Sequence, residues 1–143
     1  MGKRVLLVDD DPVVLELGRA ALESAQFEVT TQADALGMLS TLMRTEPDVV
    51  VLDVSMPSLR GDHAVGVVRR GAGQRPCFVV LHSGMPVDEL RTLASSVGAD
   101  AYISKSMTLA YLGVAVRRLV EEGDRVGHGA LMGSCTEQEA KYG

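Results

Sequence analysis

The chain has 143 residues, which is enough for one ordinary domain and too few for two of typical size. Hydrophobic residues make up 46% of it and charged residues 23%, a balance typical of globular domains that excludes a wholly disordered chain. The formal net charge of −5 argues against direct binding to nucleic acid, which needs a basic surface. The longest run without a charged residue, 76–87, is shorter than the roughly 20 residues that a membrane helix needs. We therefore expect a cytoplasmic protein that neither binds nucleic acid directly nor enters a membrane.

Five short runs of apolar, mostly β-branched residues predict strands. Their apolar residues are consecutive rather than alternating, which is typical of strands that helices cover on both faces of a parallel sheet. The predicted strands are Arg4–Val8, Phe27–Thr30, Val49–Leu52, Cys77–Leu81 and Ala101–Ile103.

Apolar residues at helical spacing predict a helix after each strand. The first helix is expected to begin at Pro12 with Asp11 as its N-cap, and Gly98 is expected to end the fourth. The third, from Gly61 to Arg70, has the weakest pattern because Gly66 interrupts it. The residues expected on the buried faces of the other four helices are Val14, Leu17, Ala21, Leu22 and Ala25; Leu36, Leu39 and Met43; Leu90, Leu93, Ala94 and Val97; and Leu109, Leu112, Val116, Leu119 and Val120.

This succession of strands and helices predicts an α/β fold with a parallel sheet, helices on both faces and right-handed crossovers. The periodic pattern stops after Glu122. We therefore assign residues 1–122 to the domain and expect 123–143 to be a flexible tail or the start of a linker. In sheets of this kind ligands bind beyond the carboxyl ends of the strands, so the functional site is expected there.

Carboxylates, a hydroxyl and a lysine follow the predicted strands. Asp9–Asp11 come after the first strand, Asp53 after the third, Ser83 after the fourth and Lys105 after the fifth. Carboxylates that lie close together repel one another unless a cation neutralises them, and oxygen ligands of this kind suit Mg²⁺ beside a phosphoryl group. A lysine and a hydroxyl can then bind the phosphoryl oxygens. The sequence therefore predicts a site for a metal ion and a phosphoryl group.

These segments resemble the receiver domain of two-component response regulators, from about residue 3 to residue 121. The resemblance implies a flavodoxin-like, doubly wound (βα)5 fold whose five-stranded parallel sheet has the order 2-1-3-4-5. One position departs from the family: Ser106 stands where a proline usually follows the lysine, which leaves open whether that peptide is cis or trans and how Lys105 approaches the site. The matching pieces are Asp9-Asp10 in LLVDDDP; Asp53 in VVVLDVSMPSLRG, with Met56-Pro57 and Gly61 after it; Ser83-Gly84; and GADAYISK, which contains Tyr102 and Lys105.

The resemblance implies a chemical role for each residue of the site. Asp53 would accept a phosphoryl group from a histidine kinase or a phosphotransfer protein. Asp9, Asp10, Asp53 and the backbone carbonyl of Ser55 would hold Mg²⁺. Lys105 would pair first with the carboxylate and then with the phosphoryl oxygens.

The resemblance also implies a switch formed by Ser83 and Tyr102. Phosphorylation would shift an existing equilibrium and reshape the face made by the fourth helix, the fifth strand and the fifth helix. A downstream protein effector, or an output domain outside this chain, would read that face, and a homodimer could form through it. Because Met85 has no charge to orient a water, we expect slow self-dephosphorylation; beyond this and slow self-phosphorylation, no enzyme activity is expected.

Simpler roles are also open to these residues. Asp9–Asp11 could merely cap the following helix, and Asp53 could form an Asx turn. Tyr102 could be half-buried packing. His82 is expected to point away from the neighbouring switch hydroxyl and to be structural, and Cys77 is expected to be a small buried apolar residue.

Two other functions are open as well. The first is a receiver-like module that binds a protein constitutively without phosphorylation, which Ser106 keeps under consideration. The second is a Mg²⁺-dependent aspartyl phosphohydrolase. That chemistry generally needs an acid two residues after the nucleophile to protonate the leaving group, and Ser55 occupies the position.

Overall fold

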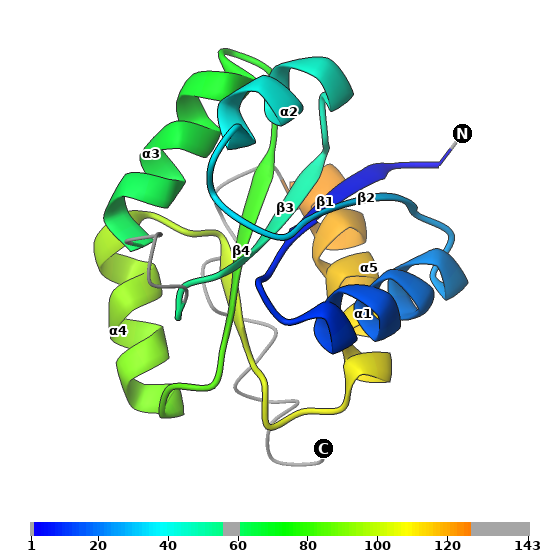
Figure 1. Ribbon diagram of the computed structural model, residues 1–143, viewed down its shortest axis with the longest axis vertical. Coiled ribbons are helices and arrows are strands. Elements are labelled where there is room, and N and C mark those ends of the chain that lie inside the picture. Colours follow the sequence, from blue (N-terminus) through cyan, green and yellow to red (C-terminus); the bar gives the residue numbers. More distant parts are fainter. Residues whose placement is uncertain (1, 56–60, 127–143) are drawn as a thin grey trace.

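The computed structural model of the protein describes residues 2–55 and 61–126, in which strands and helices alternate. The strands form one parallel sheet in the order two-one-three-four-five, which confirms the expected doubly wound α/β fold (Figure 1). The strands are β1 (Arg4–Val8), β2 (Glu28–Gln32), β3 (Val49–Asp53), β4 (Phe78–Ser83) and β5 (Ala101–Ser104), and the helices are α1 (Pro12–Ser24), α2 (Met38–Thr45), α3 (Gly61–Ala72), α4 (Val87–Val97) and α5 (Leu109–Val126).

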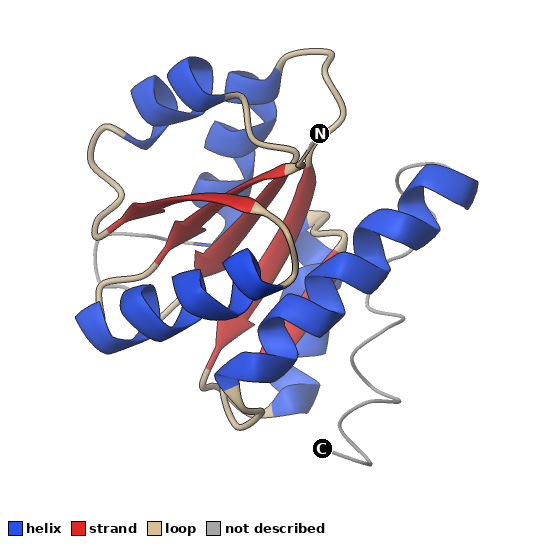
Figure 2. Ribbon diagram, turned by 90° about the vertical axis from the view of Figure 1, so that its right-hand side faces the viewer, coloured by secondary structure: helices blue, strands red, loops and turns tan. Residues whose placement is uncertain are grey.

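Helices cover both faces of the sheet, as Figures 1 and 2 show. One core lies beneath α1 and α5, and the other lies beneath α2, α3 and α4. The central strand β3 contributes alternately to both, because successive side chains of a strand point to opposite faces. Val49 and Val51 belong to the first core and Val50 and Leu52 to the second, and all four are fully buried. Burial on both faces explains why β1, β3, β4 and β5 are mostly continuous apolar runs, whereas the edge strand β2 is only partly buried.

Four strands extend past their predicted ends into polar residues. Whereas β1 has its predicted bounds, β2 ends at Gln32, β3 at Asp53, β4 at Ser83 and β5 at Ser104. In the sheet Asp53 pairs with His82, and Ser83 pairs with Ser104. The polar residues that were expected in loops therefore belong to the strands themselves, and the sheet fixes their backbone positions.

The beginning of α1 and the end of α4 agree with the sequence prediction. Pro12 is the first residue of α1, and the carboxylate of Asp11 accepts a hydrogen bond from the amide of Val13 at 2.9 Å. Leu90 and Ala94 of α4 are fully buried, and Gly98 ends that helix in the left-handed conformation, with φ of 76°. The capping side chain of Asp11 therefore marks the start of α1, and Gly98 marks the end of α4, both in the sequence and in the structure.

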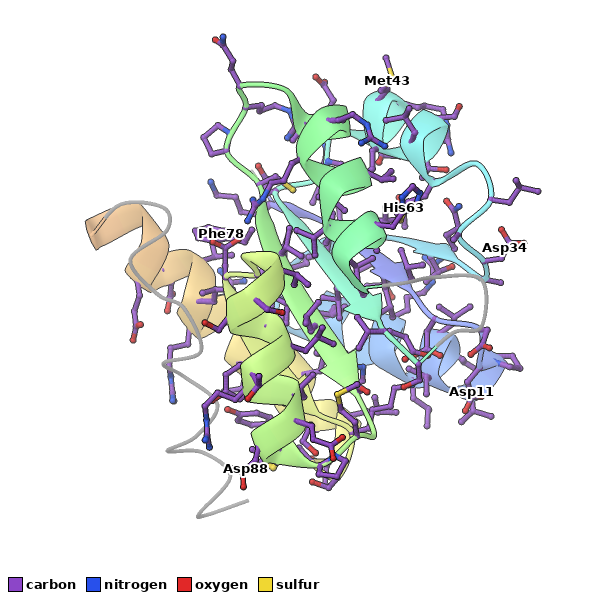
Figure 3. All side chains as sticks on the ribbon, turned by 90° about the vertical axis from the view of Figure 1, so that its left-hand side faces the viewer. Asp11, Asp34, Met43, His63, Phe78 and Asp88 are labelled. Carbon is purple, nitrogen blue, oxygen red and sulfur yellow. The ribbon has the colours of Figure 1, made fainter. Side chains whose placement is uncertain are left out.

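The buried face of α2 differs from the predicted one. Leu36, Leu39 and Met43 were expected inside, but all three are exposed, by 88%, 41% and 65%, and Leu36 lies before the first residue of the helix. Met38 and Leu42 face the core instead. Figure 3 shows Met43 on the outer side of α2, with its side chain directed away from the sheet. The prediction was wrong because α2 carries large apolar residues on both sides, so spacing alone did not select the face.

The buried face of α1 was also assigned incorrectly at one position. Leu17 was expected in the core but is half exposed, whereas its neighbour Gly18 is buried. A Cβ atom on Gly18 would lie 2.8 Å from Cδ2 of Leu7 on β1. The helix thus approaches the sheet through a residue that has no side chain, which a search for apolar spacing does not detect.

The last helix continues past the domain boundary expected at 122. It ends at Val126, and Gly123 is buried against Phe78 of β4, where a Cβ atom would lie 2.1 Å from the ring. Residues 127–143, for which a tail or linker was expected, lie outside the described residues. Among the helices described, none is both long enough and apolar enough to cross a membrane.

The contact between α1 and α5 gives a first prediction. A Cβ atom on Gly113 of α5 would lie 2.4 Å from the carbonyl oxygen of Ala21 on α1. Gly113→Ala is therefore expected to lower the free energy of unfolding by about 1–3 kcal/mol, because the helices must separate. Gly66→Ala in α3 is the control: its nearest neighbour, a guanidinium nitrogen of Arg70, is 3.9 Å away, and alanine should stabilise the helix by up to about 1 kcal/mol. Urea unfolding measures both, and equal stability of the two variants would contradict the prediction.

Candidate functional site

The carboxyl edge of the sheet brings three carboxylates together. Asp9 follows β1, and Asp53 ends the adjacent strand β3. Both are buried, with 0% and 2% exposure, while Asp10 is exposed. One ligand oxygen from each of the three lies within 4.8 Å of the others. The sequence prediction that the acidic residues meet at one edge is thus matched by the geometry.

Lys105, directly after β5, lies between two of these carboxylates. Its Nζ is 2.8 Å from Oδ2 of Asp9 and 3.3 Å from Oδ2 of Asp53. Burial alone would lower the pKa of Lys105, but the hydrogen bond to Asp9 and the negative charges of Asp53 and Asp9 outweigh it, so that the pKa is raised. The lysine is therefore a permanent positive charge at the site.

The pKa of Asp9 is raised, chiefly because burial disfavours the carboxylate. The negative charge of Asp53 acts in the same direction. Hydrogen bonds from Lys105 and from the amide of Asp11 oppose the shift but do not cancel it. A further positive charge beside Asp9 would favour its ionised form, so this buried carboxylate is suited to bind a cation.

The loop after β5 reaches the site without a proline. Throughout the described residues all peptide bonds are trans, which includes the bond between Lys105 and Ser106. The amide of Lys105 donates to the carbonyl of Ser83 at 2.8 Å. The amide of Ser106 donates to Oγ of Ser104 at 3.1 Å, and the two serine hydroxyls lie 2.8 Å apart. Serine side chains thus fix this turn and leave Lys105 in contact with the carboxylates.

Asp9 and Asp53 also form the local turn hydrogen bonds that were considered as their simpler roles. Oδ1 of Asp9 accepts from the amide of Asp11 at 2.9 Å, and Oδ1 of Asp53 accepts from the amide of Ser55 at 2.8 Å. In both residues Oδ2 is directed to Lys105. One oxygen of each carboxylate therefore holds the local turn, and the other belongs to the charged cluster.

Ser83 is fully buried at the end of β4. Its Oγ lies 3.0 Å from Oγ of Ser55 and accepts a hydrogen bond from the amide of Met85 at 3.2 Å. The sequence prediction included Ser55 as a metal ligand through its backbone carbonyl and did not predict a partner for its hydroxyl. The contact between its side chain and Ser83 was missed, because a serine two residues after a strand carries no signal for such a pairing.

Tyr102 on β5 is buried, with 2% of its surface exposed, and packs in the core beneath α4. Its hydroxyl accepts a hydrogen bond from Nε of Arg91 at 3.2 Å. Arg91 in turn pairs with Asp88 in the first turn of α4 at 3.2 Å. Tyr102 therefore connects the strand that precedes Lys105 with the surface of α4, a link through Arg91 that the sequence did not indicate.

His82 lies on the other side of β4 from Ser83, as strand alternation predicted. It is 2% exposed, and its Nδ1 has no hydrogen-bond partner in the described part of the chain. Burial, together with the positive charge of Lys105, lowers the pKa of His82 to about 4. Cys77 is buried as expected, and burial raises the pKa of its thiol to about 11, so it is not a reactive thiolate.

A doubly wound sheet with an acidic cluster and a lysine at its carboxyl edge defines a class of signalling domain, and comparison with known proteins identifies the family. The family model of the response regulator receiver domain matches residues 5–117, and the chain belongs to this family. It is thus a domain of two-component signalling and not a classical enzyme.

Individual relatives agree with this assignment. The chain is 38% identical over 117 residues to the transcriptional regulatory protein PrrA of Mycobacterium leprae, and the match covers 82% of this chain and 49% of PrrA. A CheY-like receiver domain protein from Methanospirillum hungatei superposes with a TM-score of 0.75 at 25% identity, covering 89% of this chain and all (100%) of that one. The response regulator DrrB of Thermotoga maritima gives a TM-score of 0.74 at 25% identity, covering 85% of this chain and 54% of DrrB. The chain spans about half the length of the curated relatives it matches.

Receiver domains typically bind Mg²⁺, and the residues here fit that ion. Asp9, Asp10 and Asp53 offer only oxygen ligands, and these lie close enough together to share one cation. The buried carboxylates of Asp9 and Asp53 have a single lysine between them, so a divalent ion would complete the neutralisation of the cluster.

Proposed function

We propose that this receiver domain accepts a phosphoryl group on Asp53 from a phosphohistidine of a histidine kinase or a phosphotransfer protein. The observation that carries the proposal is the position of Asp53 at the end of β3. Its carboxylate is buried, is held by the amide of Ser55, and lies 3.3 Å from Nζ of Lys105 beside the other acidic residues.

In the transfer, a lone pair of an Asp53 carboxylate oxygen attacks phosphorus. An O–P bond forms while the N–P bond of the phosphohistidine breaks, and its electron pair returns to the imidazole nitrogen. Lys105 stabilises the negative charge on the phosphoryl oxygens as a point charge fixed beside Asp53. Mg²⁺, held by Asp9, Asp10, Asp53 and the backbone carbonyl of Ser55, would supply further charge neutralisation.

We propose that Ser83 and Tyr102 convert phosphorylation into a change of surface. Ser83 would bind the new phosphoryl group, and Tyr102 would report it at the face formed by α4, β5 and α5. The hydrogen bond between Tyr102 and Arg91 of α4 supports this route. The reader of that face would be a cytoplasmic protein effector or an output domain outside this chain, and a homodimer through the same face is a second outcome.

The intact mass of the protein tests the function. After incubation with acetyl phosphate and Mg²⁺, a single phosphoryl adduct is expected on the parent protein and none on Asp53→Asn. Removing the metal with a chelator before adding the phosphodonor should abolish the adduct. Because Met85 brings no charge to orient a water, the adduct is expected to persist for minutes rather than seconds. No adduct on the parent, with no response to beryllofluoride, would instead support the constitutive binding module.

A further inference from the structure

Ser55 touches both the proposed nucleophile and the proposed switch residue. Its amide donates to Oδ1 of Asp53 at 2.8 Å, and its Oγ lies 3.0 Å from Oγ of Ser83. Ser55 therefore connects the ends of β3 and β4 through two hydrogen bonds, one to Asp53 and one to Ser83. The bond through the amide would form with any residue other than proline at this position, whereas the bond through Oγ requires a hydroxyl.

The backbone of Ser83 is fixed on two sides. It pairs with Ser104 of β5 in the sheet, and its carbonyl accepts from the amide of Lys105 at 2.8 Å. Because Ser83 is also fully buried, its remaining freedom is the rotation of its side chain and of the hydroxyl hydrogen. The direction of that hydrogen decides whether Ser83 can donate to an anion on Asp53.

The number of hydrogens at Ser83 limits the arrangements. A hydroxyl has one hydrogen and two lone pairs, and Oγ of Ser83 already accepts from the amide of Met85. If Ser83 donated to Ser55, its hydrogen would be used. If Ser55 donates instead, both lone pairs of Ser83 are occupied, and its hydrogen is left for another acceptor. A phosphoryl anion on Asp53 favours the second arrangement, because hydrogen bonds to ionised acceptors are the stronger ones.

We propose that Ser55 is a positioning residue whose side-chain hydroxyl donates to Oγ of Ser83 and thereby directs the Ser83 hydrogen toward the phosphoryl group. This inference rests on the proposed function and adds a side-chain role to the backbone carbonyl that was expected to bind the metal. It predicts that the hydroxyl of Ser55 matters only while Ser83 also has one.

The affinity for beryllofluoride in the presence of Mg²⁺ tests the inference, with four variants and a control. Ser55→Ala removes the donor, Ser55→Thr keeps a hydroxyl, Ser83→Ala removes the acceptor, and the double variant closes a thermodynamic cycle. Ser96→Ala is the matched control, because it removes an exposed serine hydroxyl that donates within its own helix, α4, to the carbonyl of Leu93 and lies outside the site. Since Ser55 is exposed, its replacement is expected to leave the fold intact, which urea unfolding verifies.

Ser55→Ala is expected to weaken beryllofluoride binding by about three- to tenfold, which is the effect of one well-formed hydrogen bond. Ser55→Thr and Ser96→Ala should stay within about twofold of the parent protein. In the Ser83→Ala background, loss of the Ser55 hydroxyl should change the affinity by less than about twofold, because its partner is absent.

Two results would overturn the inference alone: parent-like affinity of Ser55→Ala, or an equal loss from that substitution in both backgrounds. A parent protein that takes neither beryllofluoride nor a phosphoryl group would overturn the proposed function, and the role of Ser55 with it. The mass measurement on the parent and on Asp53→Asn separates the two cases.

Discussion

Replacing Asp100 by alanine is expected to lower the free energy of unfolding by about 3 kcal/mol. This carboxylate, directly before β5, is 5% exposed, and its Oδ2 accepts from the amide of Val79 at 2.7 Å and pairs with Arg69 of α3 at 3.2 Å. Without it, the buried amide of Val79 would lose this acceptor and Arg69 its charged partner, and breaking a buried pair costs about 3–5 kcal/mol. Arg69 would keep its hydrogen bonds to the carbonyls of Cys77 and Gly98. The lower end applies because the side chain of Arg69 is 39% exposed and water can hydrate it.

Asp88→Ala is the matched control for this prediction. Asp88 and Arg91 also form an aspartate–arginine pair with an N–O distance of 3.2 Å, but the side chain of Asp88 is 89% exposed. Exposed pairs contribute up to about 1 kcal/mol, so this variant should lose no more than that. Urea unfolding at neutral pH compares the two, and similar losses would show that burial does not set the strength of the Asp100 contact.

The second large effect is a dependence of stability on pH that originates at His82. Its pKa is lowered to about 4 in the folded protein, against an ordinary value near 6.5. Between these values the unfolded chain binds a proton at this residue and the folded protein does not. The free energy of unfolding therefore falls as the pH decreases from 6.5 toward 4, by about 3 kcal/mol from this residue alone.

Two variants isolate the contribution of His82. In His82→Leu the free energy of unfolding should fall much less between pH 7 and pH 4.5 than in the parent protein, because the variant has no buried imidazole at this position. His63→Gln removes an exposed histidine of α3. Its free energy of unfolding should fall between the two pH values by as much as that of the parent protein. Urea unfolding at the two pH values provides the comparison. An unchanged pH dependence in His82→Leu would assign the effect to other groups.

The sequence predicted all five strands to within two residues at each end, and most clearly β1, β3, β4 and β5, which are almost entirely buried. A fully buried strand shows as a continuous apolar run, and its polar end marks the edge where Asp53, Ser83 and Lys105 meet. The neighbours in the sheet followed from the resemblance to receiver domains, since apolar runs do not encode strand order. The site was thus located from strand ends together with a family pattern.

The helices were predicted less well where their surfaces were ambiguous. On α2 the exposed Leu39 and Met43 carry the same apolar signal as the buried Met38 and Leu42. On α1 the buried position is Gly18, which has no hydrophobic side chain to detect. In both helices tertiary packing, rather than spacing, selected the face.

The side-chain partners of the site were outside the reach of sequence analysis. Arg69 and Arg91 read as ordinary arginines of surface helices, yet they bind Asp100 and the hydroxyl of Tyr102. Likewise, Ser55 was selected for its carbonyl and not for its hydroxyl. Such contacts depend on the distance between elements that are remote in the sequence, and no local pattern encodes that distance.

The inclusion of Asp53 and Ser83 in the strands restricts how a signal can leave the site. Each lies in register with a residue of the neighbouring strand at the carboxyl end of the sheet, so shifting either backbone would disturb the pairing of β3 with β4 or of β4 with β5. A phosphoryl group placed on Asp53, as proposed, would therefore act on a backbone that the sheet holds in place. In that proposal the parts left to move would be side chains and the segments that follow the strands, such as the turn from Ser83 into α4. The sheet would serve as the fixed part of the proposed switch, and the helix that follows β4 as a part that moves relative to it.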